Sequence, residues 1–171
     1  VCASNLHQQQ MAFTIYARNN SGKYPIELDT GRWPMGHYVN PYEAQQALLT
    51  DNLISDDKLF YCPSSPAGYW ISHETTSPRS DGLRWSGYPY WAKYQRALNV
   101  DDKIAMDITS DSDTMILSDK TLINGSDIKK SNHLWNGKTA GGNITFNDGH
   151  TKWRPHTSMI RRFSLVYEFW Y

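Results

Sequence analysis

Residues 1–25 read VCASNLHQQQMAFTIYARNNSGKYP and decide the fold. Leu6 and Phe13 lie at helical spacing, with further apolar residues beside them, so one face can pack against a core. The run Asn19–Gly22 favours the backbone conformations that end a helix. The stretch therefore predicts a long helix that ends near Asn20.

The start of this helix is unusual in its sequence. The apolar pattern already runs at Val1, and no capping serine or aspartate precedes it. Because helices generally begin at such a cap, we expect the helix to continue from a segment ahead of Val1.

Three stretches of the chain resemble motifs of bacterial type IV pilin-like proteins, and most closely the prepilin-like proteins with a C-terminal His-x9-Asp-Gly motif. They are Cys2-x-x-Asn5-Leu6 with Tyr16-Ala17-x-Asn19-Asn20-x-Gly22-x-Tyr24-Pro25, then Leu59-Phe60-Tyr61-Cys62-Pro63-Ser64, and finally Asn132-His133 with Asp148-Gly149-His150. Two departures stand out. Ser65 takes the place of an acidic residue, and fourteen residues instead of nine separate His133 from Asp148.

The resemblance implies an α+β fold, in which a long N-terminal helix packs on an antiparallel sheet of about four strands. It implies a single domain over residues 1–171, made of the helix (1–20), a connecting loop-and-helix segment (21–63) and the sheet with its loops (64–171). It further implies a structural subunit of a type IV pilus or type II secretion filament, and not an enzyme. Its partners would be like or unlike filament subunits. A membrane-spanning segment ahead of Val1 would hold it in the bacterial inner membrane before assembly into a periplasmic or cell-surface filament.

Length and composition agree with an extracytoplasmic domain. The chain has 171 residues, 17 basic and 17 acidic side chains, and many aromatic residues. One core is the default for this length. No basic run or excess positive charge attracts nucleic acid, which we therefore do not expect as a partner. Hydrolase nucleophile, P-loop and dinucleotide-binding motifs are absent from the sequence.

The two cysteines, Cys2 and Cys62, are too few for a disulfide scaffold and are wrongly spaced for a zinc motif. They can form at most one bridge, which would tie the first helix to the segment before Pro63. Closing this loop of about 60 residues would contribute roughly 4 kcal/mol in the loop-entropy model. The alternative is a pair of small buried thiols.

Local patterns predict further elements. Asn40-Pro41-Tyr42-Glu43 combines a cap, a helix-start proline and a following glutamate, so a second helix is expected over residues 41–50. The expected extended segments are Leu59–Cys62, Tyr88–Tyr94, Thr114–Ser118 and a hairpin of Asn143–Phe146 with His150–Arg154. Asp148-Gly149 is a strong turn signal for that hairpin.

Side-chain roles follow from the hairpin pattern. Ile144, Phe146 and Trp153 are the expected packing residues, and Gly141-Gly142 permits a close approach of backbones. The tail after Pro155 is apolar enough to add a last strand or short helix.

The polar residues near the terminal motif allow a metal site. Asp119, Asn147 and Asp148 form an oxygen-rich set that suits calcium at least as well as zinc, although no cofactor is required. His133, Asp148 and His150 could instead ligate the metal of a hydrolase. A purely structural role also explains them, because Asp148 suits a turn and His150 starts a strand.

Aromatic residues gather in the polar stretch that follows Cys62. A surface glycan or a neighbouring subunit could stack on them, whereas a core role would bury them. This group consists of Trp70, Trp85, Tyr88, Tyr90 and Trp91. A carbohydrate-binding module is therefore an alternative to the filament subunit.

Overall fold

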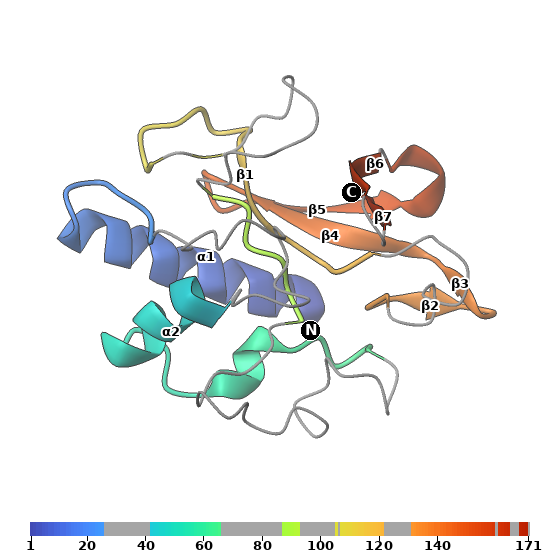
Figure 1. Cartoon of the computed structure of the whole chain (residues 1–171), viewed down its shortest axis with the longest axis horizontal. Helices are drawn as coiled ribbons and strands as arrows, with labels where there is room; N and C mark the ends of the chain where they lie inside the picture. The colour runs from blue at the N-terminus through green and yellow to red at the C-terminus, as the bar shows by residue number, and fades with distance from the viewer. Residues whose placement is uncertain are drawn as a thin grey trace.

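The computed structural model describes residues 1–25, 42–65, 87–92, 105, 107–121, 131–159, 161–164 and 168–170, with the backbone alone for 42, 43, 161–164 and 168–170. Its architecture is α+β, as expected. A long N-terminal helix, α1 (Cys2–Asn19), lies along a three-stranded antiparallel sheet (Figure 1). Only the coarse fold class is confirmed, because the main sheet in the described residues has fewer strands than expected.

The main sheet has the strand order β1 (Met115–Ser118), β4 (Gly141–Phe146), β5 (Thr151–Pro155). The β4–β5 hairpin turns at Asp148-Gly149 as predicted, and Gly149 has φ +91°, which glycine adopts without strain. A Cβ atom on Gly141 would lie 2.3 Å from the Arg154 carbonyl oxygen, which confirms the close backbone approach predicted there.

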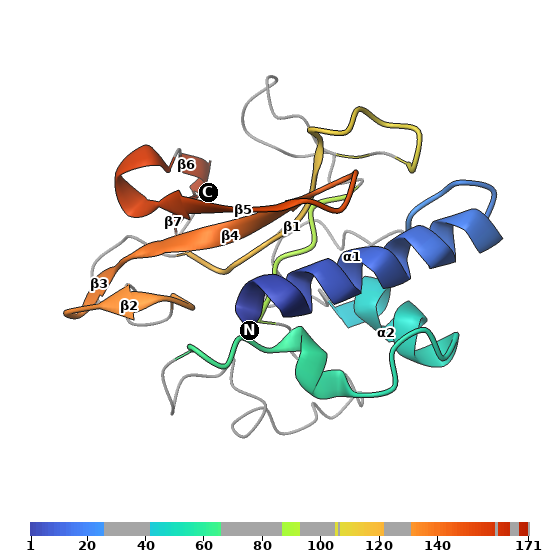
Figure 2. The same ribbon diagram turned by 180° about the vertical axis from the view of Figure 1, so that it is seen from behind.

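Two short ribbons and one helical turn extend this frame. β2 (Leu134–Trp135) pairs with β3 (Lys138–Thr139), and β6 (Arg161–Ser164) pairs with β7 (Glu168–Trp170), both antiparallel. The 3-10 turn η3 (His156–Ser158) follows β5. Figure 2, seen from behind, shows both ribbons beyond the N-terminal end of α1, so the sheet reaches past the helix.

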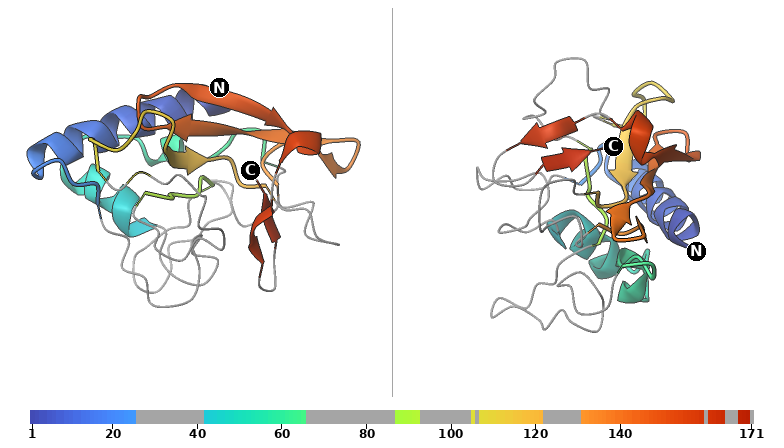
Figure 3. Two further views of the ribbon diagram at one scale, coloured as in Figure 1. Left: turned by 90° about the horizontal axis from the view of Figure 1, so that it is seen from above. Right: turned by 90° about the vertical axis from the view of Figure 1, so that its right-hand side faces the viewer.

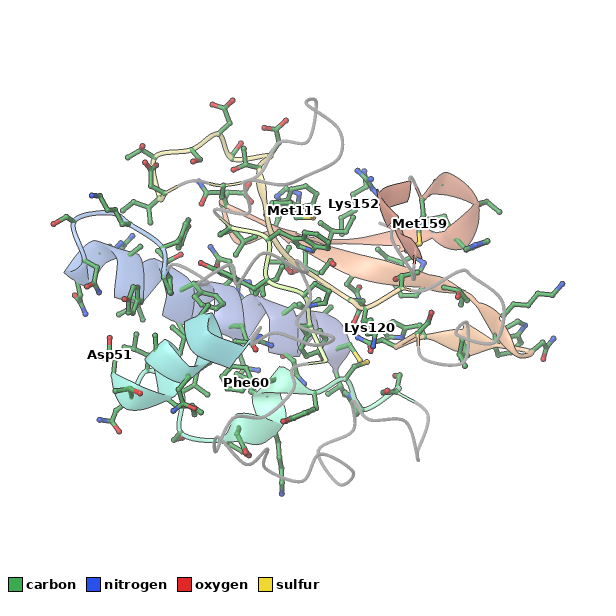
Figure 4. The ribbon with its side chains drawn as sticks, in the orientation of Figure 1. Asp51, Phe60, Met115, Lys120, Lys152 and Met159 are labelled. Carbon is green, nitrogen blue, oxygen red and sulfur yellow. The ribbon has the colours of Figure 1, made fainter. Side chains whose placement is uncertain are left out.

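The segment between α1 and the sheet covers the other side of the helix. α2 (Tyr42–Thr50) confirms the predicted second helix. The 3-10 turn η1 (Asp57–Phe60) takes up the first two residues of the expected extended segment, Leu59 and Phe60, whereas Tyr61 has extended backbone as expected. Asp56 caps η1 by accepting a hydrogen bond from the Lys58 N–H (2.9 Å), a local contact that competes with extended backbone. Phe60 is fully buried near α1 (Figure 4).

The core is continuous from α2 and η1 through α1 to the 88–92 segment and β1. Figure 1 shows α1 between the sheet and the α2–η1 segment, and in the left view of Figure 3, seen from above, the strands overlie the N-terminal half of α1. Its buried residues are Cys2, Leu6, Gln9, Gln10, Ala12, Phe13 and Ala17. The helix is thus held on two sides, while Met11 and Ile15 stay exposed.

The strand predicted at Tyr88–Tyr94 is wrong for the residues that the structure describes, 87–92. This segment lies along the free edge of β1, where Trp91 N–H donates to Ile116 O and Ser118 N–H donates to Pro89 O. Only Tyr90 and Leu117 form a bridge. Pro89 has no N–H to donate, and proline interrupts a regular strand for this reason. The segment occupies the place of a fourth strand without forming one.

Two of the expected packing residues of the hairpin differ from prediction. Ile144 is buried, Phe146 is half-buried, and Trp153 is 43% exposed. Phe146 stacks on His150 with ring centroids 4.3 Å apart. The alternation of apolar and polar side chains along β5 did not show which face of the strand is buried, so the exposure of Trp153 was not predicted.

Tyr24 joins the end of the α1 segment to the hairpin turn. Its hydroxyl donates to Asn147 Oδ1 at 2.5 Å, and burial raises its pKa to about 12. Replacing Tyr24 with phenylalanine is expected to lower the free energy of unfolding by about 1–2 kcal/mol, because Asn147 Oδ1 loses this donor. Urea denaturation measures this loss. Tyr16→Phe, at a half-buried tyrosine near the end of α1, is the control, and an equal effect of both would contradict the prediction.

Candidate metal centre

Asp119 lies where β1 ends, beside β4. Its N–H donates to Asn143 O at 2.8 Å, so the backbone pairing continues one residue past the strand. The carboxylate is fully buried and accepts from Asn143 N–H (2.7 Å) and Asn143 Nδ2 (2.6 Å) on Oδ2, and from Asn132 Nδ2 (3.0 Å) on Oδ1. These donors hold the carboxylate in a fixed orientation.

His133 approaches the same carboxylate from the turn before β2. Its Nε2 lies 2.8 Å from Asp119 Oδ2, and its side chain is 16% exposed. Its backbone carbonyl accepts from Ala140 N–H, and Trp153 contacts the ring edge-on at 5.1 Å. The neighbouring Asn132 donates its backbone N–H to Lys120 O. Lys120 marks this place in Figure 4, near the N-terminal end of α1.

Cys2 and Cys62 bring two sulfur atoms to the carboxylate and imidazole. Cys2 is the first residue of α1, and Cys62 follows η1. Cys62 Sγ lies 3.8 Å from His133 Nε2, and Cys2 Sγ lies 3.7 Å from Ser64 Oγ. One ligand atom of each of the four residues Cys2, Cys62, Asp119 and His133 lies within 4.8 Å of the others. We call this group the Cys-His-Asp cluster.

Protonation in the cluster differs from that of the free side chains. A hydrogen bond from the Cys62 thiol lowers the pKa of Cys2 to about 4, against the effect of burial. Donating that bond, together with burial, raises the pKa of Cys62. Burial lowers the pKa of His133, but its bond to Asp119 and its contact with Cys2 outweigh this and raise it to about 9. The two thiols and the imidazole thus influence one another's protonation, beside a buried carboxylate with little access to water.

The orientation of His133 distinguishes a catalytic proton relay from a metal site. In a catalytic cysteine–histidine–aspartate relay, the acid binds one ring nitrogen and the nucleophile faces the other. Here both Asp119 Oδ2 and Cys62 Sγ face Nε2. A proton relay cannot run through the ring in this arrangement, whereas a single central ion could contact Nε2, the carboxylate and both sulfur atoms.

The predicted metal set of Asp119, Asn147 and Asp148 is not brought together. Asn147 lies in the hairpin turn, where its side chain accepts from Tyr24 and donates to Ser110 O at 2.6 Å. Asp148 pairs with His150 at 2.6 Å on the surface of the same turn. The His150 backbone N–H holds the pKa of Asp148 below its usual range. Asp119 lies instead beside Asn143, along β4 from the turn.

The predicted hydrolase set of His133, Asp148 and His150 is divided in the same way. His133 contacts Asp119, whereas Asp148 and His150 contact each other. Within the terminal family motif, Asn132 and His133 therefore serve the buried cluster, and Asp148, Gly149 and His150 form the turn.

The aromatic group also differs from a binding surface. Tyr88, Tyr90 and Trp91 are buried, and burial raises the pKa of Tyr88. The indole of Trp91 donates to Ser118 Oγ at 2.9 Å. These three residues belong to the core, which corrects their prediction as ligand contacts. Trp70 and Trp85 lie outside the described residues.

The predicted disulfide is not formed in this structure. Cys2 and Cys62 are buried free thiols, although their predicted proximity is present. No motif spacing indicated that Asp119 and His133 would join the two cysteines, because the four residues lie far apart along the chain. The one available signal was the position of Asp119 directly after the predicted strand Thr114–Ser118, where a side chain can turn back onto the sheet.

No family model, curated protein or solved structure matches this chain. Within the part of the chain that the structure describes, no helix is both long and apolar enough to cross a membrane.

Proposed function

We propose that this chain is a structural subunit, a pilin or pseudopilin, of a filament of the type IV pilus or type II secretion class. It would act by assembly with further subunits and not by catalysis. The proposal starts from the three motif resemblances. The observation that carries it further is an unpaired apolar strip along α1.

This strip consists of Met11 and Ile15, which are 50% and 45% exposed on the side of α1 away from its buried face. A groove lies beside it, lined by α1 and by the segment that leads into η1. Its lining residues are Gln8, Met11, Ala12, Ile15, Leu53, Ile54, Ser55, Asp56 and Leu59. Exposed apolar side chains next to a groove favour packing of another apolar element.

We assign α1 of a neighbouring copy of this chain as the occupant of this groove. A filament built around packed N-terminal helices requires contacts along the helix that the subunit's own sheet does not cover. Met11 and Ile15 are one helical turn apart and lie on that uncovered side. The proposed contact is therefore helix to helix, supplemented by the apolar residues before η1.

Assembly in the organism that carries the gene tests this function. The variant Met11→Glu/Ile15→Glu is expected to reduce the sheared filament fraction by about tenfold or more, since burying unpaired carboxylates costs well over 1.4 kcal/mol. The matched variant Met11→Leu/Ile15→Val keeps the strip apolar and should assemble like the unaltered protein. Immunoblotting and electron microscopy measure the fraction.

Circular dichroism of the purified variants checks that both keep the fold. The proposal fails if no filament fraction contains the unaltered protein. It also fails if the doubly charged variant assembles as well as its apolar control.

The rival functions have less support. The carbohydrate-binding module loses three of its five proposed contacts to the core. The metal-dependent hydrolase loses the convergence of His133 with Asp148 and His150. Neither rival has a specific observation in its favour.

A further inference from the structure

We propose that the Cys-His-Asp cluster binds one zinc ion in a closed four-ligand site that fastens α1 to the sheet. This inference does not depend on the filament proposal. The proposed ion would stabilise the fold, in a chain whose cysteines lack the spacing of a zinc motif.

The ligand set suits zinc by its chemistry. Two sulfur atoms, one imidazole nitrogen and one carboxylate oxygen give four ligands of the kinds that tetrahedral zinc sites use. Calcium prefers six or more oxygen ligands, so sulfur and nitrogen atoms argue against it here. Soft sulfur ligands favour zinc over magnesium or manganese as well.

The distances are close to those of a zinc site. With zinc bonds of about 2.1 Å to nitrogen or oxygen and about 2.3 Å to sulfur, tetrahedral geometry separates N from O by about 3.4 Å and S from N by about 3.6 Å. The corresponding separations are 2.8 Å for His133 Nε2 to Asp119 Oδ2, and 3.8 Å for Cys62 Sγ to His133 Nε2. The remaining separations among the four ligand atoms are at most 4.8 Å. Side-chain adjustments of about 1 Å would therefore admit the ion.

The surroundings supply an outer shell for the ligands. Asn143 donates two hydrogen bonds to Asp119 Oδ2, and Asn132 donates one to Oδ1. Such outer contacts orient carboxylate ligands in metal sites. The ion would replace the direct contact between His133 Nε2 and Asp119 Oδ2, and these asparagine contacts would remain in place.

The site is closed and is therefore structural. Cys2, Cys62 and Asp119 are buried, and His133 is the member that reaches solvent. The four protein ligands complete the tetrahedral coordination sphere of the ion, so no coordination position is left open for a substrate. The ligands come from the start of α1, the residue pair after η1, the end of β1 and the turn before β2. A Cys2–Cys62 disulfide would join only the first two of these.

Metal titration of the full chain tests the proposal. The protein is reduced, freed of metal with a chelator, and titrated with Zn²⁺ and separately with Co²⁺. We expect one ion per chain and an intense cobalt spectrum with sulfur-to-cobalt charge transfer, which reports thiolate ligands without any substitution. Zinc should also protect both thiols from a thiol reagent and raise the melting temperature.

Matched histidine variants locate the site. His133→Gln is expected to lose stoichiometric zinc binding, and His150→Gln, which alters an exposed histidine paired to a different aspartate, is expected to keep it. Three results would overturn the proposal. They are a reduced, folded chain that binds no zinc, equal zinc binding by the two variants, and a Cys2–Cys62 disulfide with no bound metal in protein isolated from its host without reductant.

Discussion

Replacing Asp119 with alanine is expected to lower the free energy of unfolding by about 3–5 kcal/mol, even with chelator present to remove any metal. The carboxylate is fully buried and accepts from Asn132, Asn143 and His133. Without it, several buried donors and an imidazolium lose their partner, and each loss carries a desolvation cost. A chain of this size should melt about 10 °C lower.

Asp148→Ala is the matched control for this prediction. Asp148 also pairs with a histidine, but its side chain is 43% exposed. Exposed pairs of this kind contribute about 0–1 kcal/mol. Calorimetry or guanidinium denaturation compares the two variants. Equal losses would mean that the buried carboxylate does not organise the end of β1 as we infer.

Replacing Phe13 with alanine is expected to lower the free energy of unfolding by about 3–5 kcal/mol. Phe13 is fully buried in the centre of α1, and its ring lies 4.6 Å from the Tyr90 ring at an interplanar angle of 31°. Removing it leaves a cavity between α1 and the segment along β1, and it also removes the aromatic contact. Denaturant titration should show a lower midpoint with an unchanged slope.

Ile15→Ala serves as the control on the same helix. Ile15 is 45% exposed, so its replacement removes few buried contacts, and alanine is the better helix former. The free energy of unfolding of Ile15→Ala is expected to lie within about 0.5 kcal/mol of that of the unaltered protein. If Ile15→Ala were as destabilising as Phe13→Ala, the assignment of the inner and outer faces of α1 would be wrong.

Elements with local signals were predictable from the sequence. The spacing of Leu6 and Phe13 predicts α1, the cap and proline before Tyr42 predict α2, and Asp148-Gly149 predicts the β4–β5 hairpin. Each of these signals depends on residues a few positions apart, which the sequence shows directly. The α+β class was what the motif resemblance implied, and these elements agree with it.

The Cys-His-Asp cluster was not predictable as a unit. Asp119 and His133 were recognised as candidates, and so were Cys2 and Cys62, but as parts of different sites. Their meeting depends on the pairing of β1 with β4 and on the position of α1, which are contacts between distant parts of the chain. The proximity of Asp148 and His150 in sequence favoured the wrong partners.

The burial of Tyr88, Tyr90 and Trp91 could not be read from composition for a similar reason. Aromatic residues in a polar, proline-containing stretch suit either a binding loop or an irregular core segment. The hydrogen bonds to β1 decide between these, and they depend on which sheet edge is free. The sequence shows Pro89 but not the strand beside which it lies.

Two neighbouring glutamines fix the axial position of α1. Gln9 Nε2 donates to Leu59 O at 2.9 Å, and its Oε1 accepts from Gln45, while Gln10 Nε2 donates to Asn147 O at 3.0 Å. These anchors reach two different flanking elements, the α2–η1 segment and the β4–β5 turn, so sliding the helix by even one 1.5 Å residue step would break bonds to both. Tension applied along the helix would therefore be transmitted to the globular body without slippage.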